Sequence, residues 1–319
     1  MLYSVIIPVY NRPDEIYELL KSLTKQTFKR FEVLIIEDGS ETRCETVVNQ
    51  FKGQLDVHYY YKENSGQGFS RNFGFERAKG DYFVVFDSDC LIPPHYFETV
   101  TQFLSLNPAD CWGGPDKAHP SFTPVQKAIN FSMTSFLTTG GIRGKKKHLG
   151  PYHPRSFNMG ISREVYEKTG GYKLTRMGED LEFSIRIIKA GFKTVFIEDA
   201  FVYHKRRTNL KQFFWQLHFF GRARVNIKRF YPDELKPVHL FPAIFLFGLI
   251  ASFVFLISNI PVLKFIIWLY LLYSLMLFFG SYIKEKSLHI SLLSVFCAFI
   301  QLSAYAIGFI SELKREMKV

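Results

Sequence analysis

The chain has 319 residues, 47% of them apolar and 22% charged, with a formal net charge of +11. This length is enough for one domain with a sizeable core plus an appendage. The four cysteines are widely spaced and form no CxxC pair, which excludes a disulfide framework and a cysteine zinc site and fits a reducing compartment. Because no signal-peptide pattern precedes the first strand-like run, we expect the globular part to face the cytoplasm.

The first part of the chain alternates between strand-like and helix-like patterns. Four apolar runs have the composition of buried strands, at residues 5–7, 33–36, 57–61 and 82–86. Between them, residues 13–23 start at a proline and place apolar residues on one face, and residues 67–79 end at Gly80, so both segments predict helices. This alternation predicts an α/β fold with a mostly parallel sheet.

Polar residues follow these strands, at the sheet edge where parallel α/β folds bind ligands. They are Asn11, Asp38, Asp87 and Asp89. The oxygen ligands of Asp87-Ser88-Asp89 suit Mg²⁺ or Mn²⁺, and such an ion can neutralise a departing diphosphate. The alternative is a solvated turn or a helix cap. Asp38 can accept an N–H group from a nucleobase, or form an Asx turn with Gly39.

Three later features carry weaker signals. Gly66 and Gly68 form a GxG sequence before a predicted helix, but position 71 is Arg, so the full dinucleotide-binding pattern is absent and Arg71 becomes a candidate phosphate or base contact. Glu179-Asp180 opens a helix predicted to run to residue 190, either as a functional pair or as a simple N-terminal cap. His204 follows an apolar run and is a metal ligand or a structural histidine.

The C-terminal third is apolar and follows a basic segment. Residues 240–258 and 265–283 are free of charge and near the length of a bilayer crossing, and residues 288–310 form a third candidate. Nine Lys and Arg against two Asp and Glu lie between His204 and His239. We therefore expect membrane lipid as a partner, a multi-pass inner-membrane location and a cytoplasmic globular domain. Nucleic acid is disfavoured because this charge adjoins the apolar segments.

Taken in order, the motifs resemble those of the family 2 glycosyltransferases. They are residues 4–11, 37–40, 71–74, 87–89 and 178–180, with 157–163 and 170–172 matching an acceptor-side segment. The resemblance implies a GT-A fold, a nucleotide-diphosphate sugar donor with UDP-sugar foremost, inversion at the anomeric carbon, and a divalent metal, Mn²⁺ or Mg²⁺. The expected domains are a catalytic domain at 1–225, a basic segment at 226–239, a transmembrane region at 240–311 and a charged tail at 312–319.

The resemblance also implies a role for each matching residue. Four residues border the nucleoside or bind its base, namely Pro8, Tyr10, Asn11 and Asp38. Arg71 faces the base or the diphosphate, and Asp89, helped by Asp87, holds the metal and the ribose side. Asp180 is the catalytic base, and His204 resembles a late metal-ligating histidine.

The processive motif Gln-x-x-Arg-Trp is absent, which favours single sugar addition to an acceptor hydroxyl in cell-surface polysaccharide or glycolipid synthesis. Residues 108–154 are interpreted as mostly loop, with Lys145 to Lys147 beside the acceptor cleft. One rival is a nucleotidyltransferase, which would show a glycine-rich loop with Lys after the first strand. The other is a non-enzymatic binding module, which would be expected to lose the Asp87-Asp89 or Glu179-Asp180 carboxylates.

Overall fold

The computed structural model describes residues 1–140, 152–256 and 261–317. The chain divides into two compact units, and each is made from two separate stretches: 1–119 with 144–205, and 120–143 with 206–319. The domain boundaries at 225, 239 and 311 stay a prediction from the sequence.

The first unit is built on a seven-stranded sheet in the order β3-β2-β1-β4-β8-β6-β9. Its strands are β1 (Tyr3–Val9), β2 (Phe31–Asp38), β3 (Val57–Lys62), β4 (Tyr82–Phe86), β6 (Cys111–Gly113), β8 (Asn158–Ser162) and β9 (Thr194–Phe196). The first four strands pair in parallel, and β8 runs antiparallel to both β4 and β6. The predicted mostly parallel α/β sheet is confirmed, with the ends of β2, β1 and β4 at one edge.

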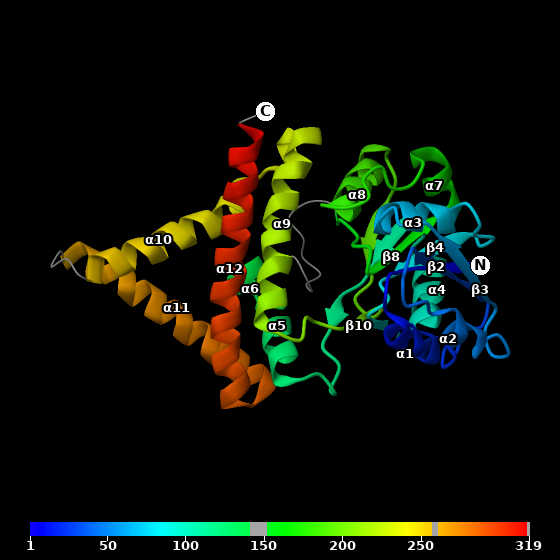
Figure 1. Ribbon diagram of the computed structural model, residues 1–319, viewed down its shortest axis with the longest axis horizontal. Helices are drawn as coiled ribbons and strands as arrows, with labels where there is room; N and C mark the ends of the chain where they lie inside the picture. Colours follow the sequence, from blue (N-terminus) through cyan, green and yellow to red (C-terminus); the bar gives the residue numbers. More distant parts are fainter. Residues whose placement is uncertain (141–151, 257–260, 318–319) are drawn as a thin grey trace. The chain divides into compact units, whose positions relative to one another are not determined.

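Helices cover both faces of this sheet (Figure 1). They are α1 (Pro13–Leu23), α2 (Glu45–Asn49), α3 (Gln67–Phe75), α4 (Tyr96–Leu106), α7 (Arg163–Thr169) and α8 (Glu179–Lys189). One core cluster joins the sheet to side chains from α1, α2 and α4, and another joins it to side chains from α3, α7 and α8. The apolar face predicted for residues 13–23 is buried as expected, at Ile16, Leu19, Leu20 and Leu23.

A second, three-stranded sheet lies in the same unit. Its strands are β5 (Cys90–Leu91), β7 (Asp116–Lys117) and β10 (Val202–His204), in the order β5-β10-β7. Gly114 allows the chain before β7 to approach the chain before β10, because a Cβ at Gly114 would lie 1.9 Å from the carbonyl oxygen of Ala200. This small sheet brings together residues that are far apart in the sequence.

Two sequence expectations are wrong in detail. Helix α3 ends at Phe75 rather than at Lys79, because the N–H of Lys79 donates to Glu32 and the N–H of Gly80 donates to Ser4. The described part of the segment 108–154 is not mostly loop, since it holds β6, β7, α5 (Pro124–Thr134) and α6 (Phe136–Thr139). Helix α5 starts with a capping box between Thr123 and Gln126. Lys145 to Lys147 lie outside the described residues.

The second unit is helical, with α5 and α6 joined by α9 (Leu210–Phe230), α10 (Phe241–Leu256), α11 (Pro261–Glu285) and α12 (Leu288–Glu316). Helices α9 and α12 lie side by side (Figure 1). Their backbones approach closely, since a Cβ at Gly308 would lie 2.0 Å from the carbonyl oxygen of His218. Glu312 of α12 pairs with Arg222 and Arg229 of α9.

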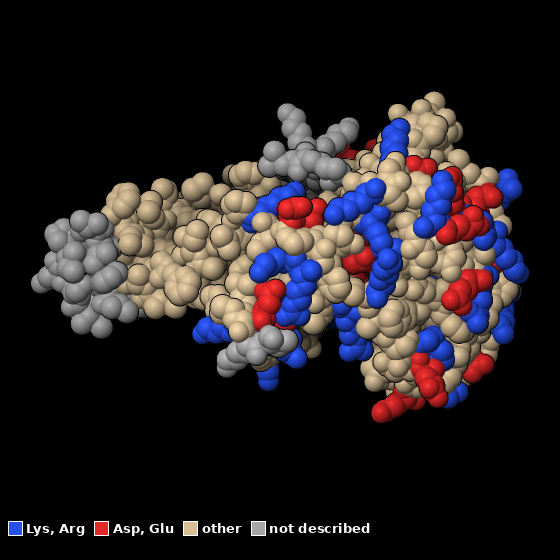
Figure 2. Space-filling view, turned by 90° about the horizontal axis from the view of Figure 1, so that it is seen from above, with Lys and Arg blue, Asp and Glu red and all other residues tan. Residues whose placement is uncertain are grey.

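Two helices in the described residues are long and apolar enough to cross a membrane, Phe265–Glu285 and Leu288–Glu316. These match the predicted segments at 265–283 and 288–310. For the predicted span at 240–258, the structure gives a shorter apolar helix, Pro237–Ser252. Residues 257 and 258 lie outside the described residues. On the face seen in Figure 2, the described surface over α10 is uncharged.

We predict that Gly160→Ala destabilises the first unit. A Cβ at Gly160 would lie 2.0 Å from the ring of Trp112, which is fully buried, so the substitution overpacks the core at a cost of about 1–3 kcal/mol. Gly53→Ala is the control, because a Cβ there meets nothing within 4 Å. Thermal unfolding of the purified protein should show a lower melting temperature for Gly160→Ala alone, and equal melting temperatures for the two variants would contradict the packing described here.

Candidate active site

The residues predicted to form the site reach the same edge of the sheet. Asp38 ends β2, Tyr10 and Asn11 follow β1, and Asp87 and Asp89 follow β4, and these three strands are parallel neighbours. The arrangement follows from alternating strands and helices, which return every strand in the same direction. Pro8 lies within β1, and the Tyr10 side chain is 49% exposed at its end.

Arg71 is a buried cation between two acidic motifs. Its Nη2 lies 2.9 Å from Asp87 Oδ1 and its Nη1 lies 3.3 Å from Glu179 Oε1, and its side chain is only 1% exposed. The ring of Tyr172 lies 5.2 Å from the guanidinium carbon. Arg71 therefore neutralises one carboxylate from the β4 end and one from the start of α8. Its predicted contact with the base or diphosphate stays a prediction.

The adjacent carboxylates Glu179 and Asp180 have different surroundings. Burial raises the pKa of Glu179, the charge of Asp180 adds to this, and Arg71 opposes it. Glu179 also accepts a hydrogen bond from the Gln67 amide. The Asp180 side chain is 21% exposed, with Oδ2 3.5 Å from Arg155 Nη1. Glu179 thus belongs to the buried network, and Asp180 is the more accessible carboxylate.

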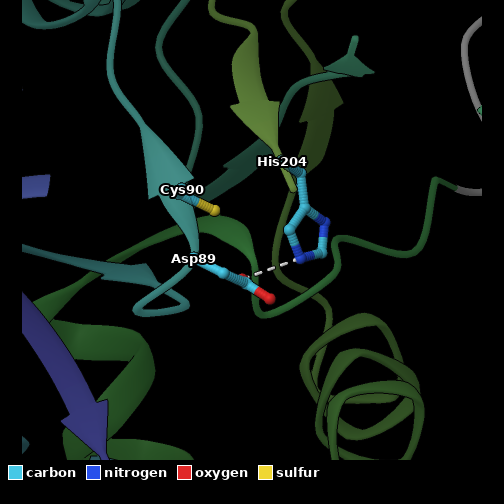
Figure 3. A group of neighbouring side chains, drawn as sticks. All are labelled: Asp89, Cys90 and His204. Carbon is cyan, nitrogen blue, oxygen red and sulfur yellow. Dashed lines mark ion pairs between the residues drawn. The ribbon is translucent and has the colours of Figure 1, made fainter. Parts of the chain in front are cut away.

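Asp89 and His204 form the group best suited to a metal (Figure 3). Asp89 Oδ1 lies 3.0 Å from His204 Nε2, and the Cys90 thiol completes a set of ligand atoms within 4.8 Å of one another. Burial raises the pKa of the Cys90 thiol well above its usual value, and the charges of Asp89 and Asp87 add to this. Because the thiolate is the form that binds metal, Asp89 and His204 are the better ligand pair. Their oxygen and nitrogen atoms fit a divalent ion such as Mn²⁺.

The Asp38 carboxylate organises the loop that follows β3. It accepts hydrogen bonds from the backbone N–H groups of Ser65 and Gly66, both at 2.9 Å, and from Lys62 Nζ at 2.6 Å. Burial acts to raise the pKa of Asp38, but Lys62 and the Ser65 N–H lower it overall. The N–H of Gly66, the first glycine of the GxG segment, is thus directed at Asp38, whereas the N–H of Gly68 donates to the carbonyl oxygen of Thr175. Its contact with a nucleobase stays a prediction.

Asn11 shapes the neighbouring loop after β2. Its φ of 53° is uncommon for a residue other than glycine, and its side-chain oxygen accepts from the N–H groups of Glu41 and Thr42. Its own N–H donates to the Ser40 hydroxyl. Asn11 therefore joins the ends of β1 and β2 at the place predicted for a nucleoside.

Sequence reasoning missed two residues next to the predicted ones. Arg155 pairs with Asp180, and the Asp116 carboxylate lies 3.9 Å from His204 Nδ1 with its side chain 1% exposed. Asp116 follows Gly113-Gly114-Pro115 in a segment interpreted as loop. A short apolar run before those glycines was the one signal for a strand there.

Comparison with known proteins identifies the family. The sequence profile described as "Glycosyl transferase family 2" matches residues 4–170, slightly more than half of the chain. The chain belongs to this family.

Curated relatives carry the same description. An uncharacterised glycosyltransferase of Rickettsia typhi is 37% identical over 104 residues, covering 33% of this chain and 32% of the relative. One from Haemophilus influenzae is 30% identical over 200 residues, covering 59% and 62%. The glycosyltransferase AglE of Haloferax volcanii is 26% identical over 220 residues, covering 64% and 67%. The match thus spans from about one third to two thirds of these relatives' lengths.

Solved structures share the fold. The mannosyltransferase PcManGT of Pyrobaculum calidifontis, in complex with GDP-Man and Mn²⁺, superposes with a TM-score of 0.64 at 15% identity, covering 93% of this chain and 86% of its own. TarS 1–349 of S. aureus, in complex with UDP-GlcNAc, superposes with a TM-score of 0.51 at 18% identity, covering 99% and 92%. These likenesses confirm the predicted GT-A fold.

We predict that Arg71→Met destabilises the protein by about 3–5 kcal/mol, because it leaves the carboxylates of Asp87 and Glu179 without their cation. Adding Glu179→Gln should recover part of the loss, since the double variant no longer holds an uncompensated charge at the buried position. Lys168→Met, which breaks an exposed pair with Glu164, is the control and should cost less than about 1 kcal/mol. Thermal unfolding measures all four proteins. Equal stability of Arg71→Met and wild type, or a double variant no more stable than Arg71→Met, would contradict this role.

Proposed function

We propose that this glycosyltransferase is an inverting enzyme that transfers one sugar from a nucleotide-diphosphate sugar to an acceptor hydroxyl. The observation that carries the proposal is the link that Arg71 makes between two acidic motifs. It pairs with Asp87, close to the Asp89–His204 pair, and with Glu179, next to the more exposed carboxylate of Asp180. A ligand pair for a metal and a separate proton acceptor are the two components that direct displacement needs.

The donor would lie over the ends of β1 and β2. Its nucleoside would contact Pro8, Tyr10 and Asn11, and its base would meet Asp38. The half-exposed Tyr10 ring and the loop fixed by Asn11 support this placement. A UDP-sugar is our first choice. PcManGT was solved with GDP-Man and TarS with UDP-GlcNAc, so both nucleotides belong in the test.

Asp89 and His204 would hold the divalent ion, with Asp87 beside them on the ribose side. A bound Mn²⁺ or Mg²⁺ supplies electrostatic stabilisation to the diphosphate that leaves. Mn²⁺ in the PcManGT complex supports this choice of metal. Arg71 is paired with Asp87, whereas Asp89 Oδ1 meets His204, so Asp89 is the carboxylate assigned to the ion.

Asp180 would act as the base. It takes the proton of the acceptor hydroxyl while that oxygen bonds to the anomeric carbon and the bond from this carbon to the diphosphate oxygen breaks on the opposite face. The configuration at the carbon inverts, and no sugar is attached to the enzyme. Arg155 holds the Asp180 carboxylate in place at 3.5 Å.

The acceptor would be a carbohydrate or a lipid-linked molecule in cell-surface polysaccharide or glycolipid synthesis. The two helices able to cross a membrane support a multi-pass inner-membrane protein in contact with lipid, with its catalytic unit in the cytoplasm. The basic residues between His204 and His239 support that orientation.

The direct test is a panel of nucleotide sugars with the detergent-solubilised protein, scoring donor hydrolysis and transfer with Mn²⁺ or Mg²⁺. We expect one donor to be turned over in a metal-dependent way. If no donor is turned over, or turnover is equal in EDTA, the proposal is wrong.

Two isosteric substitutions separate the assigned roles. Asp89→Asn should weaken donor affinity in the presence of Mn²⁺ as well as catalysis, because it removes a charge facing the metal. Asp180→Asn should keep donor and metal binding while transfer falls by about 10² or more, because the amide accepts no proton. Calorimetry with donor and Mn²⁺, together with transfer rates, measures both effects. Near wild-type transfer by Asp180→Asn would contradict its role and make Glu179 the next carboxylate to test.

A further inference from the structure

The side chain of His204 lies between two carboxylates. Its Nε2 is 3.0 Å from Asp89 Oδ1, and its Nδ1 is 3.9 Å from Asp116 Oδ2. Asp116 is the most buried of the three, with 1% of its side chain exposed against 13% and 14% for Asp89 and His204. A carboxylate buried this deeply is held there by neighbours that offset the loss of hydration, and the imidazole is one such neighbour.

Backbone pairing fixes this arrangement. Strand β10 runs parallel to β7 with Val202 opposite Asp116, and antiparallel to β5 with His204 opposite Cys90. Side chains two residues apart on a strand lie on the same face, so His204 lies on the face that carries Asp116. The position of Asp116 relative to the imidazole is therefore set by the sheet and by the close approach at Gly114.

The ring of His204 is held from a second direction. The Phe157 ring stacks on it, with centroids 5.0 Å apart and planes 25° apart. The N–H of Lys205 donates to the carbonyl oxygen of Asp89, which joins the end of β10 to the metal motif. Stacking fixes the plane of the imidazole but not which ring nitrogen faces Asp89. The Asp116 carboxylate on the Nδ1 side favours the orientation in which Nε2 faces Asp89.

We propose that Asp116 is a positioning residue for His204. The Asp116 carboxylate attracts the N–H of Nδ1 and so favours the tautomer whose proton is on Nδ1. The lone pair of Nε2 then points toward Asp89 Oδ1, where the ion would be bound. The second ring N–H of a metal-binding histidine commonly donates a hydrogen bond to a carboxylate, and loss of that partner weakens metal binding by about 10–100-fold. The inference rests on the metal site of the proposed function, and nothing in the family match assigns a role to Asp116.

The test measures the affinity for Mn²⁺ alone, by the loss of the free Mn²⁺ signal in electron paramagnetic resonance, without any sugar donor. The variants are Asp116→Asn, His204→Ala and the two combined. Asp116→Asn should weaken Mn²⁺ binding by about 10–100-fold. The combined variant should bind no more weakly than His204→Ala, because Asp116 has no imidazole left to orient. Asp81→Asn is the matched control, since Asp81 precedes β4 at the strand end opposite Asp87 and its side chain is 65% exposed.

The outcomes separate this inference from the metal site itself. The positioning role would be overturned if Asp116→Asn bound Mn²⁺ with wild-type affinity. It would also be overturned if the combined variant bound Mn²⁺ more weakly than His204→Ala by the same factor that separates Asp116→Asn from wild type. The second result would mean that Asp116 attracts the ion by its own charge. If wild type binds no Mn²⁺, or His204→Ala binds it as wild type does, the proposed metal site fails instead. Melting temperatures of the apo variants show whether a weakened variant is still folded, and Asp116→Glu, which keeps the charge, should retain more affinity than Asp116→Asn if the fold is intact.

Discussion

The candidate active site depends on the burial of one guanidinium among carboxylates. Asp87, Asp89, Glu179 and Asp180 come from two distant parts of the chain, and gathering them without a cation would cost several kcal/mol through repulsion and lost hydration. Arg71 bonds to one member of each pair, Asp87 and Glu179, from a position inside the core. The remaining two carboxylates are thereby left for separate chemistry.

This division of charge gives the two acidic motifs their different character. Asp89 meets His204 and, at 3.5 Å, Arg12, whereas Asp180 meets Arg155. In the proposed mechanism, one end of the site would take the cation and the leaving diphosphate, and the other would supply the proton acceptor. The same buried link joins the start of α8 to the end of β4, so the distance between the two ends is set by core packing rather than by loops.

The large sheet was predictable because its signals are local. Residues 5–7, 33–36 and 82–86 are apolar runs followed by polar residues, and each became a parallel strand ending at the site. The helix at Pro13–Leu23 followed from the spacing of its apolar residues. Helix α5 was also signalled, by Thr123, Pro124 and Gln126, but the surrounding glycines and prolines favoured a loop.

The small sheet was beyond sequence reasoning. Strands β5 and β7 have two residues each, too few for any periodicity, and β10 pairs with β7 across more than a quarter of the chain. The pairing of Asp116 with His204 exists only through this contact. Similarly, the sequence marks Arg71 as a basic residue in a helix, while its burial depends on Asp87, Glu179 and Tyr172 meeting around it.

We propose that Arg71 pairs with Asp87 and Glu179 and leaves Asp89 with His204 as the metal end of the site. Pulsed electron paramagnetic resonance of the Mn²⁺-loaded protein tests it most directly, because the electron spin reports nitrogen atoms bonded to the ion. We expect a ¹⁴N hyperfine coupling in the wild-type protein that disappears in His204→Ala. Bound Mn²⁺ with no nitrogen coupling in wild type, or a coupling that persists in His204→Ala, would contradict the account.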